Sequence, residues 1–327
     1  MANQTLASSP LRLSLFGGGT DIPFVFNNLG KGISITASLD LPVTVGTTTR
    51  PIDKGIKLKY SSNEIAYDIE SIIHPIFKET LKHFEYEFEE DKGLEIFSTA
   101  SIASGSGLGS SAAFTTSLVK CLSNHLRNKD IGDKELLMLA TEIEHKSGND
   151  QIGYQDQVAS IFGSICIANY YQDNIKISKA SKNWEEGIID IIEKKGFLFK
   201  TNSRIGISSN YIDSQKLENK LKMYEKVLKL AESIDLTTEN YNEDKLIELL
   251  LETSVLAKKM KIRSREIIDI ENKLNELGAI YCKQLGAGGG GFIFSLFKNS
   301  NPEIPKNLQE RMIRPKISRK GTSILTI

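Results

Sequence analysis

Residues 104–113 read SGSGLGSSAA, in which glycines alternate with other residues and two serines precede two alanines. Upstream, Leu94-Glu95-Ile96 alternates apolar and polar residues, as a strand with one buried face does, and Phe97 follows. Downstream, apolar residues recur at helical spacing, at Phe114, Leu118, Cys121, Leu122 and Leu126. The run is therefore predicted to be a loop that connects a strand to a helix.

This loop has the composition of a phosphate-binding cradle. Gly105, Gly107 and Gly109 allow positive φ and close approach of an anion, and the following helix offers free N–H groups at its N-terminus. Ser110 and Ser111 add hydroxyl groups beside that position. The loop is neither a Walker loop, because no Gly-Lys-Ser/Thr follows, nor a dinucleotide fingerprint, because the sixth position of the glycine pattern is Ser110. A flexible turn capped by serine is the alternative.

The composition points to a small ligand. The chain has 327 residues, which is enough for a large core and two domains. Its 41 basic and 41 acidic residues balance, so no overall field recruits nucleic acid or an anionic membrane. Cys121, Cys166 and Cys282 lack a CxxC pair, which predicts buried thiols in a reducing compartment. Without a recognisable signal sequence or membrane span, we expect a cytoplasmic protein, whose oligomeric state stays open.

Hydrophobic periodicity divides the chain into two halves. In the first, strands are expected at 11–16, 33–39, 41–49 and 163–170, and helices near 72–84, 133–147 and 154–162. In the second, strands 197–199 and 292–297 enclose helices near 214–233, 243–261 and 264–277. The polar stretch 171–196 is expected to be irregular. We place the domain boundary there, with an N-terminal domain of residues 1–180 and a C-terminal domain of residues 181–327.

A second glycine turn follows the first predicted strand. That strand contains Arg12 and runs into Gly17-Gly18-Gly19-Thr20-Asp21. The glycines have no side chains that could block a ligand. The Asp21 carboxylate is therefore expected to point into open space and to accept hydrogen bonds from sugar hydroxyls. The planar Arg12 guanidinium suits phosphate charge. An Asx-type turn with a solvent-facing arginine is the alternative.

Two carboxylates on neighbouring predicted helices are candidates for phosphoryl-transfer chemistry. Glu144 lies near the end of one helix, and Asp156 lies at the start of the next. One carboxylate can bind magnesium while the other orients or deprotonates the attacking hydroxyl. Surface charges are the alternative. His145 has no second His or Cys at ligand spacing and is interpreted as structural.

Near the C-terminus, residues 286–291 read GAGGGG and formally satisfy GxGxxG. A strand follows where the dinucleotide motif requires a helix, so that interpretation fails. Consecutive glycines before a buried strand favour backbone packed against another loop or a ligand.

The order of these motifs resembles that of the GHMP kinases, a superfamily of sugar and mevalonate kinases. The resemblance rests on strand-Arg-GGGTD, GSGLGSSAA, IEH with DQ, and GAGGGG, and it spans almost the whole chain. It implies an α+β fold. The N-terminal domain would have the ribosomal-protein-S5-like domain 2 architecture with a left-handed βαβ unit, the C-terminal domain would be ferredoxin-like, and the site would lie between them.

The resemblance also implies a role for individual residues, with ATP and Mg²⁺ as cofactors. Asp156 would be the catalytic aspartate, Arg12 would stabilise the transferred phosphoryl group, and Ser111 and Glu144 would bind magnesium. The ATP phosphates would lie on Ser104, Gly105, Ser106, Gly107, Leu108, Gly109, Ser110 and Ser111. The acceptor would contact Gly18, Gly19, Thr20, Asp21, Arg204, Gly288 and Gly289.

Within the superfamily, galactokinases have Gly-Glu-His-Thr-Asp where this chain has Gly17-Gly18-Gly19-Thr20-Asp21, which argues against galactose. The triple glycine, Gly153-Tyr154-Gln155-Asp156-Gln157 and GAGGGGF resemble the branch that phosphorylates the anomeric hydroxyl of D-glycero-D-manno-heptose 7-phosphate. The chain departs from that branch at Ala103-Ser104 and at residues 201–204.

A sugar phosphate needs cations away from its anomeric centre. The candidates are Arg204, Lys258, Lys259 and Arg263, each of which could equally be a helix-surface charge. Other acceptors remain open, namely fucose or another hexose, or mevalonate, as does a decarboxylase of the same fold. A binding protein without catalysis is a further alternative, but the set Ser110, Ser111, Glu144 and Asp156 is complete.

Overall fold

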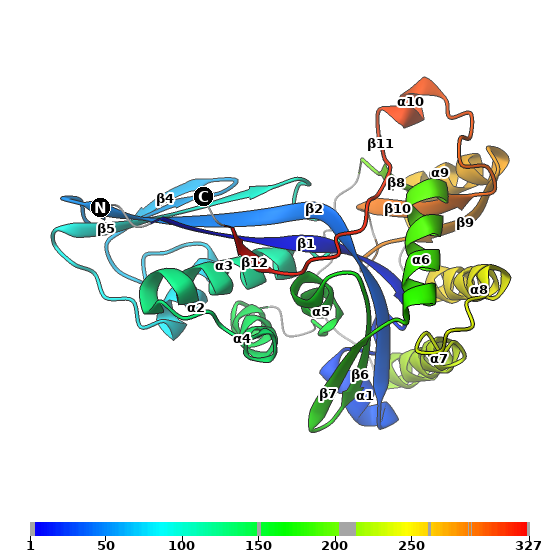
Figure 1. Ribbon diagram of the computed structural model, residues 1–327, viewed down its shortest axis with the longest axis horizontal. Coiled ribbons are helices and arrows are strands. Elements are labelled where there is room, and N and C mark those ends of the chain that lie inside the picture. Colours follow the sequence, from blue (N-terminus) through cyan, green and yellow to red (C-terminus); the bar gives the residue numbers. More distant parts are fainter. Residues whose placement is uncertain are drawn as a thin grey trace.

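The computed structural model describes residues 4–148, 152–202, 214–260, 263–286, 288 and 290–325. Two β-sheets organise these residues (Figure 1). The larger sheet has the order β12 (Ser323–Leu325), β1 (Gln4–Phe16), β2 (Gly32–Pro51), β5 (Lys92–Ala100), β3 (Ile56–Lys59) and β4 (Asn63–Ala66). From β2 the sheet branches to β6 (Ile165–Tyr171), which pairs with β7 (Asn174–Lys179).

The long strands β1 and β2 form the backbone of the first sheet. Their antiparallel register shifts just after Pro10, which pairs with Pro42. Proline has no N–H to donate, so two facing prolines interrupt the ladder and favour a bulge at this point. Sequence periodicity predicted separate strands at 33–39 and 41–49, and the structure joins them across this irregularity into one strand.

Helices cover one side of the first sheet (Figure 1). They are α2 (Pro75–His83), α3 (Ser110–Arg127), α4 (Asp133–Lys146) and α5 (Gln155–Phe162). The predicted helices near 72–84, 133–147 and 154–162 are thereby confirmed, with boundaries shifted by a few residues. A short helix, α1 (Pro23–Leu29), follows the glycine turn and was not predicted.

The second sheet is ferredoxin-like, as predicted. Its four strands are antiparallel in the order β11 (Met312–Ile313), β8 (Gly196–Lys200), β10 (Phe292–Phe297) and β9 (Ala279–Gln284). Between β8 and β9 lie α7 (Ser214–Glu232), α8 (Glu243–Met260) and α9 (Arg265–Glu276), and α10 (Lys306–Gln309) precedes β11. This fourth-first-third-second strand order is the βαββαβ arrangement. Across the described residues, no helix combines the length and apolar character that a membrane span requires.

The expectation that residues 171–196 are irregular is wrong. They contain β7 and a helix, α6 (Lys182–Lys195), which packs against β8 and β10. The Ser181 hydroxyl accepts the Trp184 N–H at the helix start, and Ile188 and Ile192 belong to its buried face. Further along, β12 returns to pair with β1, so the last described strand of the predicted C-terminal domain lies in the first sheet.

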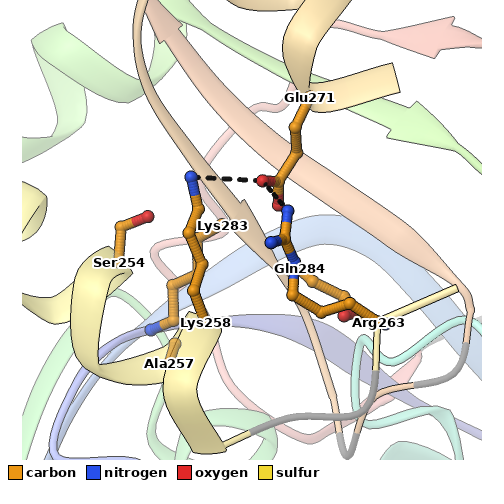
Figure 2. Close-up of a pocket in the computed structure, with 7 residues that line it drawn as sticks. All are labelled: Ser254, Ala257, Lys258, Arg263, Glu271, Lys283 and Gln284. Atoms are coloured by element: carbon orange, nitrogen blue, oxygen red, sulfur yellow. Dashed lines mark hydrogen bonds and ion pairs between the residues drawn. The ribbon is translucent and has the colours of Figure 1, made fainter. Parts of the chain in front are cut away.

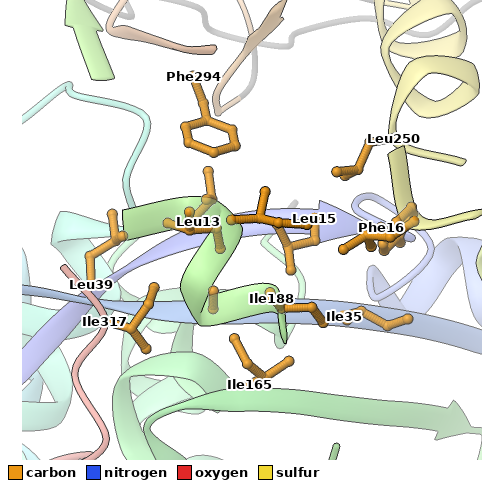
Figure 3. Close-up of a cluster of buried hydrophobic side chains, with 14 of the residues drawn as sticks. Leu13, Leu15, Phe16, Ile35, Leu39, Ile165, Ile188, Leu250, Phe294 and Ile317 are labelled. Carbon is orange, nitrogen blue, oxygen red and sulfur yellow. The ribbon is translucent and has the colours of Figure 1, made fainter. Parts of the chain in front are cut away.

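One hydrophobic core joins the two sheets (Figure 3). Leu13 and Leu15 of β1 lie in the same buried cluster as Ile188 of α6, Leu250 of α8 and Phe294 of β10. Burial of these side chains fixes the orientation of one sheet relative to the other. The loops at the end of β1 are therefore held against the second half of the chain. The three cysteines are buried and free, as predicted.

Candidate functional site

The glycine loop predicted from the sequence connects β5 to α3. Gly105, Gly107 and Gly109 have φ of +75°, +77° and +75°, which confirms that their positions need glycine. α3 then begins at Ser110, so its first N–H groups face the loop. Ser104 and Ser111 are exposed. The loop has the geometry of an anion-binding helix N-terminus.

The inner side of this loop is anchored to the protein. Leu108 lies in the core, and its N–H donates to the buried Ser106 hydroxyl (3.2 Å). The Ser106 carbonyl accepts the N–H of Phe292 at the start of β10 (3.0 Å). This hydrogen bond holds the start of β10 against the glycine loop, and Phe292 directly follows the glycine run 286–291 in the sequence.

Arg12 and Asp156 form a two-point ion pair beside the loop. Arg12 Nε donates to Asp156 Oδ1 (2.6 Å), and Nη2 donates to Oδ2 (2.9 Å). Arg12 Nη1 donates to the Gly107 carbonyl. A Cβ at Gly109 would lie 3.0 Å from Arg12 Cγ and 3.2 Å from Asp156 Oδ2. The structure therefore brings together three regions that are far apart in the sequence.

Ser111 and Glu144 also meet, as the magnesium prediction requires. Ser111 Oγ donates to Glu144 Oε1, and Gln157 Nε2 donates to Glu144 Oε2. Burial, reinforced by the nearby Asp156 charge, raises the pKa of Glu144 to about 7, although the two hydrogen bonds oppose this rise. Gln157 was not predicted, because no sequence signal relates it to a carboxylate on another helix.

Thr20 stabilises the turn from within rather than facing a ligand. Its hydroxyl lies 2.8 Å from the Gly17 carbonyl and 2.7 Å from the Ile33 carbonyl, and it accepts the Ile33 N–H (3.0 Å). The side chain is fully buried. Thr20 thus fixes the turn 17–21 to the start of β2.

The expectation that Asp21 points into open space is wrong. The residue is 1% exposed, and its carboxylate accepts the N–H of Gly19 (2.8 Å) and of Gln155 (3.0 Å). Burial raises its pKa to about 6, and the Asp156 charge adds to the rise, while the backbone hydrogen bonds lower it. Asp21 therefore connects the glycine turn to the start of α5.

Gly18 and Gly19 allow two other side chains to approach the turn. A Cβ at Gly18 would lie 2.8 Å from Ser14 Oγ and 3.3 Å from Gln155 Oε1. Gly19 has φ of +94°, and a Cβ there would overlap the Tyr224 ring of α7. The sequence did not indicate Gln155 or Tyr224 as site residues.

The remaining predictions concern the second half of the chain. Gly288 is buried with φ of +109°, whereas Arg204 and Gly289 lie outside the described residues. Lys258 and Arg263 both pair with the buried Glu271, and the Lys258 Nζ to Glu271 Oε2 distance is 3.1 Å (Figure 2). Lys259 is exposed.

A buried lysine connects this half to β1. Lys283 Nζ donates to the carbonyls of Ser14 (2.8 Å) and Leu15 (3.1 Å). Lys283 also lines the small cavity beside Lys258, Arg263 and Glu271 (Figure 2). The cationic cluster therefore lies next to the strand that leads into the glycine turn.

Two regions of the chain match models of known families. Residues 75–164 match the model of the GHMP kinases N terminal domain, and residues 240–314 match that of the GHMP kinases C terminal. The first region contains the glycine loop 104–109, Glu144 and Asp156. The second contains the Lys258 cluster and the late glycine run.

Individual relatives are distant but cover most of the chain. A D-glycero-alpha-D-manno-heptose 7-phosphate kinase from Campylobacter jejuni is 25% identical over 319 residues, which span 88% of this chain and 87% of the relative. A mevalonate kinase from Thermococcus sibiricus is 22% identical over 366 residues, with 98% of each covered. A solved D-glycero-D-manno-heptose 1-phosphate kinase from Bacteroides thetaiotaomicron gives a TM-score of 0.72 at 20% identity, with 99% of each chain covered. That structural likeness shows the fold.

Proposed function

Because this chain belongs to the GHMP kinase family, we propose that it transfers the γ-phosphoryl group of ATP to a sugar hydroxyl. The acceptor we propose is the anomeric hydroxyl of D-glycero-D-manno-heptose 7-phosphate, and the product is the 1,7-bisphosphate. The observation that carries the proposal is the Arg12–Asp156 pair beside the glycine loop, next to the Ser111–Glu144 contact. The named function of the C. jejuni relative supports the choice of acceptor.

On the donor side, residues 104–111 and the first turn of α3 would bind the ATP phosphates. The positive φ values of Gly105, Gly107 and Gly109 would let backbone N–H groups turn toward an anion, and the helix dipole would add favourable potential. Arg12 is 4% exposed and adjoins both the loop and Asp156, so it would neutralise charge on the phosphoryl group during transfer.

The oxygen atoms beside the loop fit a magnesium ion. Ser111 Oγ and the Glu144 carboxylate are already in contact, and Mg²⁺ commonly uses one or two protein oxygens with phosphate oxygens and water. Among the described residues, no cluster of three or more His, Cys, Asp or Glu could hold a metal, so ATP would complete the ligand set. When bound, the ion supplies positive charge to the β- and γ-phosphate oxygens.

On the acceptor side, Asp156 would take the proton of the attacking hydroxyl. Its side chain is 28% exposed, whereas Asp21 and Glu144 are almost fully buried. The two hydrogen bonds from Arg12 fix the direction of the carboxylate and leave each oxygen with a further lone pair. Positioned proton transfer of this kind contributes about 10²–10⁴ in rate.

The acceptor's own phosphate would bind near the cluster that Glu271 organises. Lys258, Arg263 and Lys283 line one cavity with a single carboxylate, so the cluster has a net positive charge. Lys283 hydrogen-bonds to β1 and so brings this charge close to the glycine turn 17–21, the proposed acceptor turn. A phosphate at the far end of the sugar would meet these cations while the anomeric hydroxyl faces Asp156.

A panel of acceptors tests the proposal. Purified protein with ATP and Mg²⁺ would be offered heptose 7-phosphate, unphosphorylated heptose, fucose, galactose and mevalonate, and products would be measured by mass spectrometry. We expect phosphorylation of heptose 7-phosphate, with the unphosphorylated heptose a much poorer substrate. Preferential phosphorylation of mevalonate, the named substrate of other relatives, would contradict the proposed acceptor and retain the chemistry.

A further inference from the structure

Two side chains occupy the space that Gly18 and Gly19 leave beside the acceptor turn. The Gln155 carboxamide approaches Gly18, with its Oε1 3.3 Å and its Nε2 3.5 Å from where a Cβ would be. The Tyr224 ring packs directly against Gly19. These side chains come from α5 and α7, so both halves of the chain contribute to this wall.

The Gln155 carboxamide has unused hydrogen-bonding capacity. Within the described part of the chain, its buried Oε1 has no hydrogen-bond partner. A buried acceptor without a partner costs about 1–3 kcal/mol, so its presence in a site calls for an explanation. The backbone N–H of the same residue donates to the Asp21 carboxylate (3.0 Å). Gln155 is thus held in place through its backbone, while its side-chain Oε1 has no hydrogen-bond partner among the described residues.

We propose that Gln155 and Tyr224 form the specificity wall for the acceptor, with the Gln155 amide binding sugar hydroxyls and the Tyr224 ring bounding the pocket. An amide offers a donor and an acceptor, which suits neighbouring hydroxyl groups of a polyol. The inference rests on the proposed kinase function and deepens it. Asp21 acts here as a positioning residue, through the Gln155 backbone.

Gln155→Leu tests the amide, because it keeps the size of the side chain and removes its polar atoms. We expect the KM for the acceptor to rise about tenfold, as the loss of a hydrogen bond in a buried site predicts, while the KM for ATP changes less than about twofold. Deoxy analogues of the acceptor would then be compared. For the analogue that lacks the contacted hydroxyl, the difference between wild type and variant should vanish. Gln172→Leu, in the exposed turn between β6 and β7, is the matched control.

Gly19→Ala tests the Tyr224 contact. Gly278 has the same φ of +94°, and a Cβ there would meet nothing within 4 Å, so Gly278→Ala reproduces the backbone strain without the clash. We expect only Gly19→Ala to raise the acceptor KM. An equal effect of both variants overturns the role of Tyr224.

The outcomes separate this inference from the proposed function. If wild type phosphorylates an acceptor and Gln155→Leu has the same acceptor KM, the inference fails and the kinase function stands. An equal penalty on every deoxy analogue, or on ATP, also overturns hydroxyl recognition, because it indicates a general disturbance. If wild type phosphorylates no acceptor, both the function and the inference fail.

Discussion

Burial separates the roles of the three carboxylates at the level of single residues. Asp21 and Glu144 are 1% and 2% exposed, and both have raised pKa values. Asp156 is more exposed and is held by Arg12. A buried carboxylate with internal donors suits positioning or metal binding, whereas proton transfer needs a group that the acceptor can reach. Asp156 is the carboxylate of the three that meets this requirement.

Glu144 should control the magnesium requirement. Replacing it by glutamine removes the negative charge from the proposed ligand pair, so the Mg²⁺ concentration for half-maximal activity should rise about tenfold or more. Titrating MgCl₂ at fixed ATP measures this effect. Glu142→Gln is the matched control, because Glu142 lies on the same helix, is exposed and pairs with Lys146. Identical magnesium dependence in wild type and Glu144→Gln would remove Glu144 from the ligand set.

Asp21 should make the stability of the protein depend on pH. Its pKa is about 6 in the folded chain against an ordinary value of 3.8, so between these values the folded chain keeps a proton that the unfolded chain releases. The free energy of unfolding must then fall as the pH rises through this window. Relative to Asp21→Asn, wild type should lose up to about 3 kcal/mol between pH 4 and 7. Urea unfolding of both proteins checks this, and a constant difference between them contradicts it.

Single residues were only partly predictable. Ser111, Glu144, Arg12 and Asp156 belong to recognisable motifs, and the structure brings them together. Gln157 lies in the quoted motif 153–157, but its contact with Glu144 was not predicted, and Tyr224 belongs to no motif. Their partners are set by packing between distant elements. The burial of Asp21 was missed since glycines open a turn in the sequence, while in the structure α5 closes over it.

At the level of elements, the start of α5 organises the site. Three consecutive residues, Gln155, Asp156 and Gln157, contact the turn 17–21, Arg12 and Glu144 respectively. Successive side chains on a helix point about 100° apart, so three consecutive residues of one turn can contact three different partners. The glycine loop supplies the opposite side, where Gly109 adjoins the Arg12–Asp156 pair.

Gly109 should be intolerant of a side chain for a reason beyond its backbone angle. Gly109 and Gly30 have similar φ values of +75° and +79°, but a Cβ at Gly30 would meet nothing within 4 Å. Both alanine variants should lose about 1 kcal/mol of stability. Only Gly109→Ala presses on Arg12 and Asp156, so we expect its kcat to fall more than about tenfold. Thermal unfolding measures the stability of the two variants, and steady-state kinetics measures their kcat. Equal kcat values in both would contradict the proposed effect of the Gly109 contact with Arg12 and Asp156.

Helices were predicted correctly where apolar residues repeat regularly, and one was missed where charged residues interrupt that repeat. The long helices α7, α8 and α9 were predicted because their apolar residues repeat regularly. Helix α6 was missed because charged residues and Gly187 interrupt its apolar face, which becomes evident only when Trp184 and Ile188 are seen packed in the core.

At the level of the whole molecule, the two sheets behave as one structural unit. They share a hydrophobic core, and Lys283 connects β9 to β1 just before the glycine turn 17–21. The α+β class and the ferredoxin-like second sheet were implied by the resemblance of the motifs to those of the GHMP kinases. The return of β12 to the first sheet was not predictable, since a strand of three residues is too short to show a hydrophobic pattern.

Lys283 should matter for the stability of the whole fold. Its buried ammonium group donates to two β1 carbonyls, and Lys283→Met would leave both without this donor. We expect the free energy of unfolding to fall by about 2–4 kcal/mol, as for loss of a buried charged hydrogen-bond donor. Lys298→Met, at an exposed position just after β10, is the control. Chemical denaturation measures both, and a change below about 0.5 kcal/mol in Lys283→Met would contradict the connection.

The most direct test of the central claim is phosphoryl transfer by Asp156→Asn. The variant keeps the shape of the side chain and removes its basicity, so we predict that turnover of the acceptor falls by at least about 10²-fold while ATP still binds. Asp173→Asn, in an exposed turn, should retain full activity. The measurement is product formation from ATP and acceptor by mass spectrometry, with ATP affinity determined separately. Undiminished turnover in folded Asp156→Asn would contradict the account.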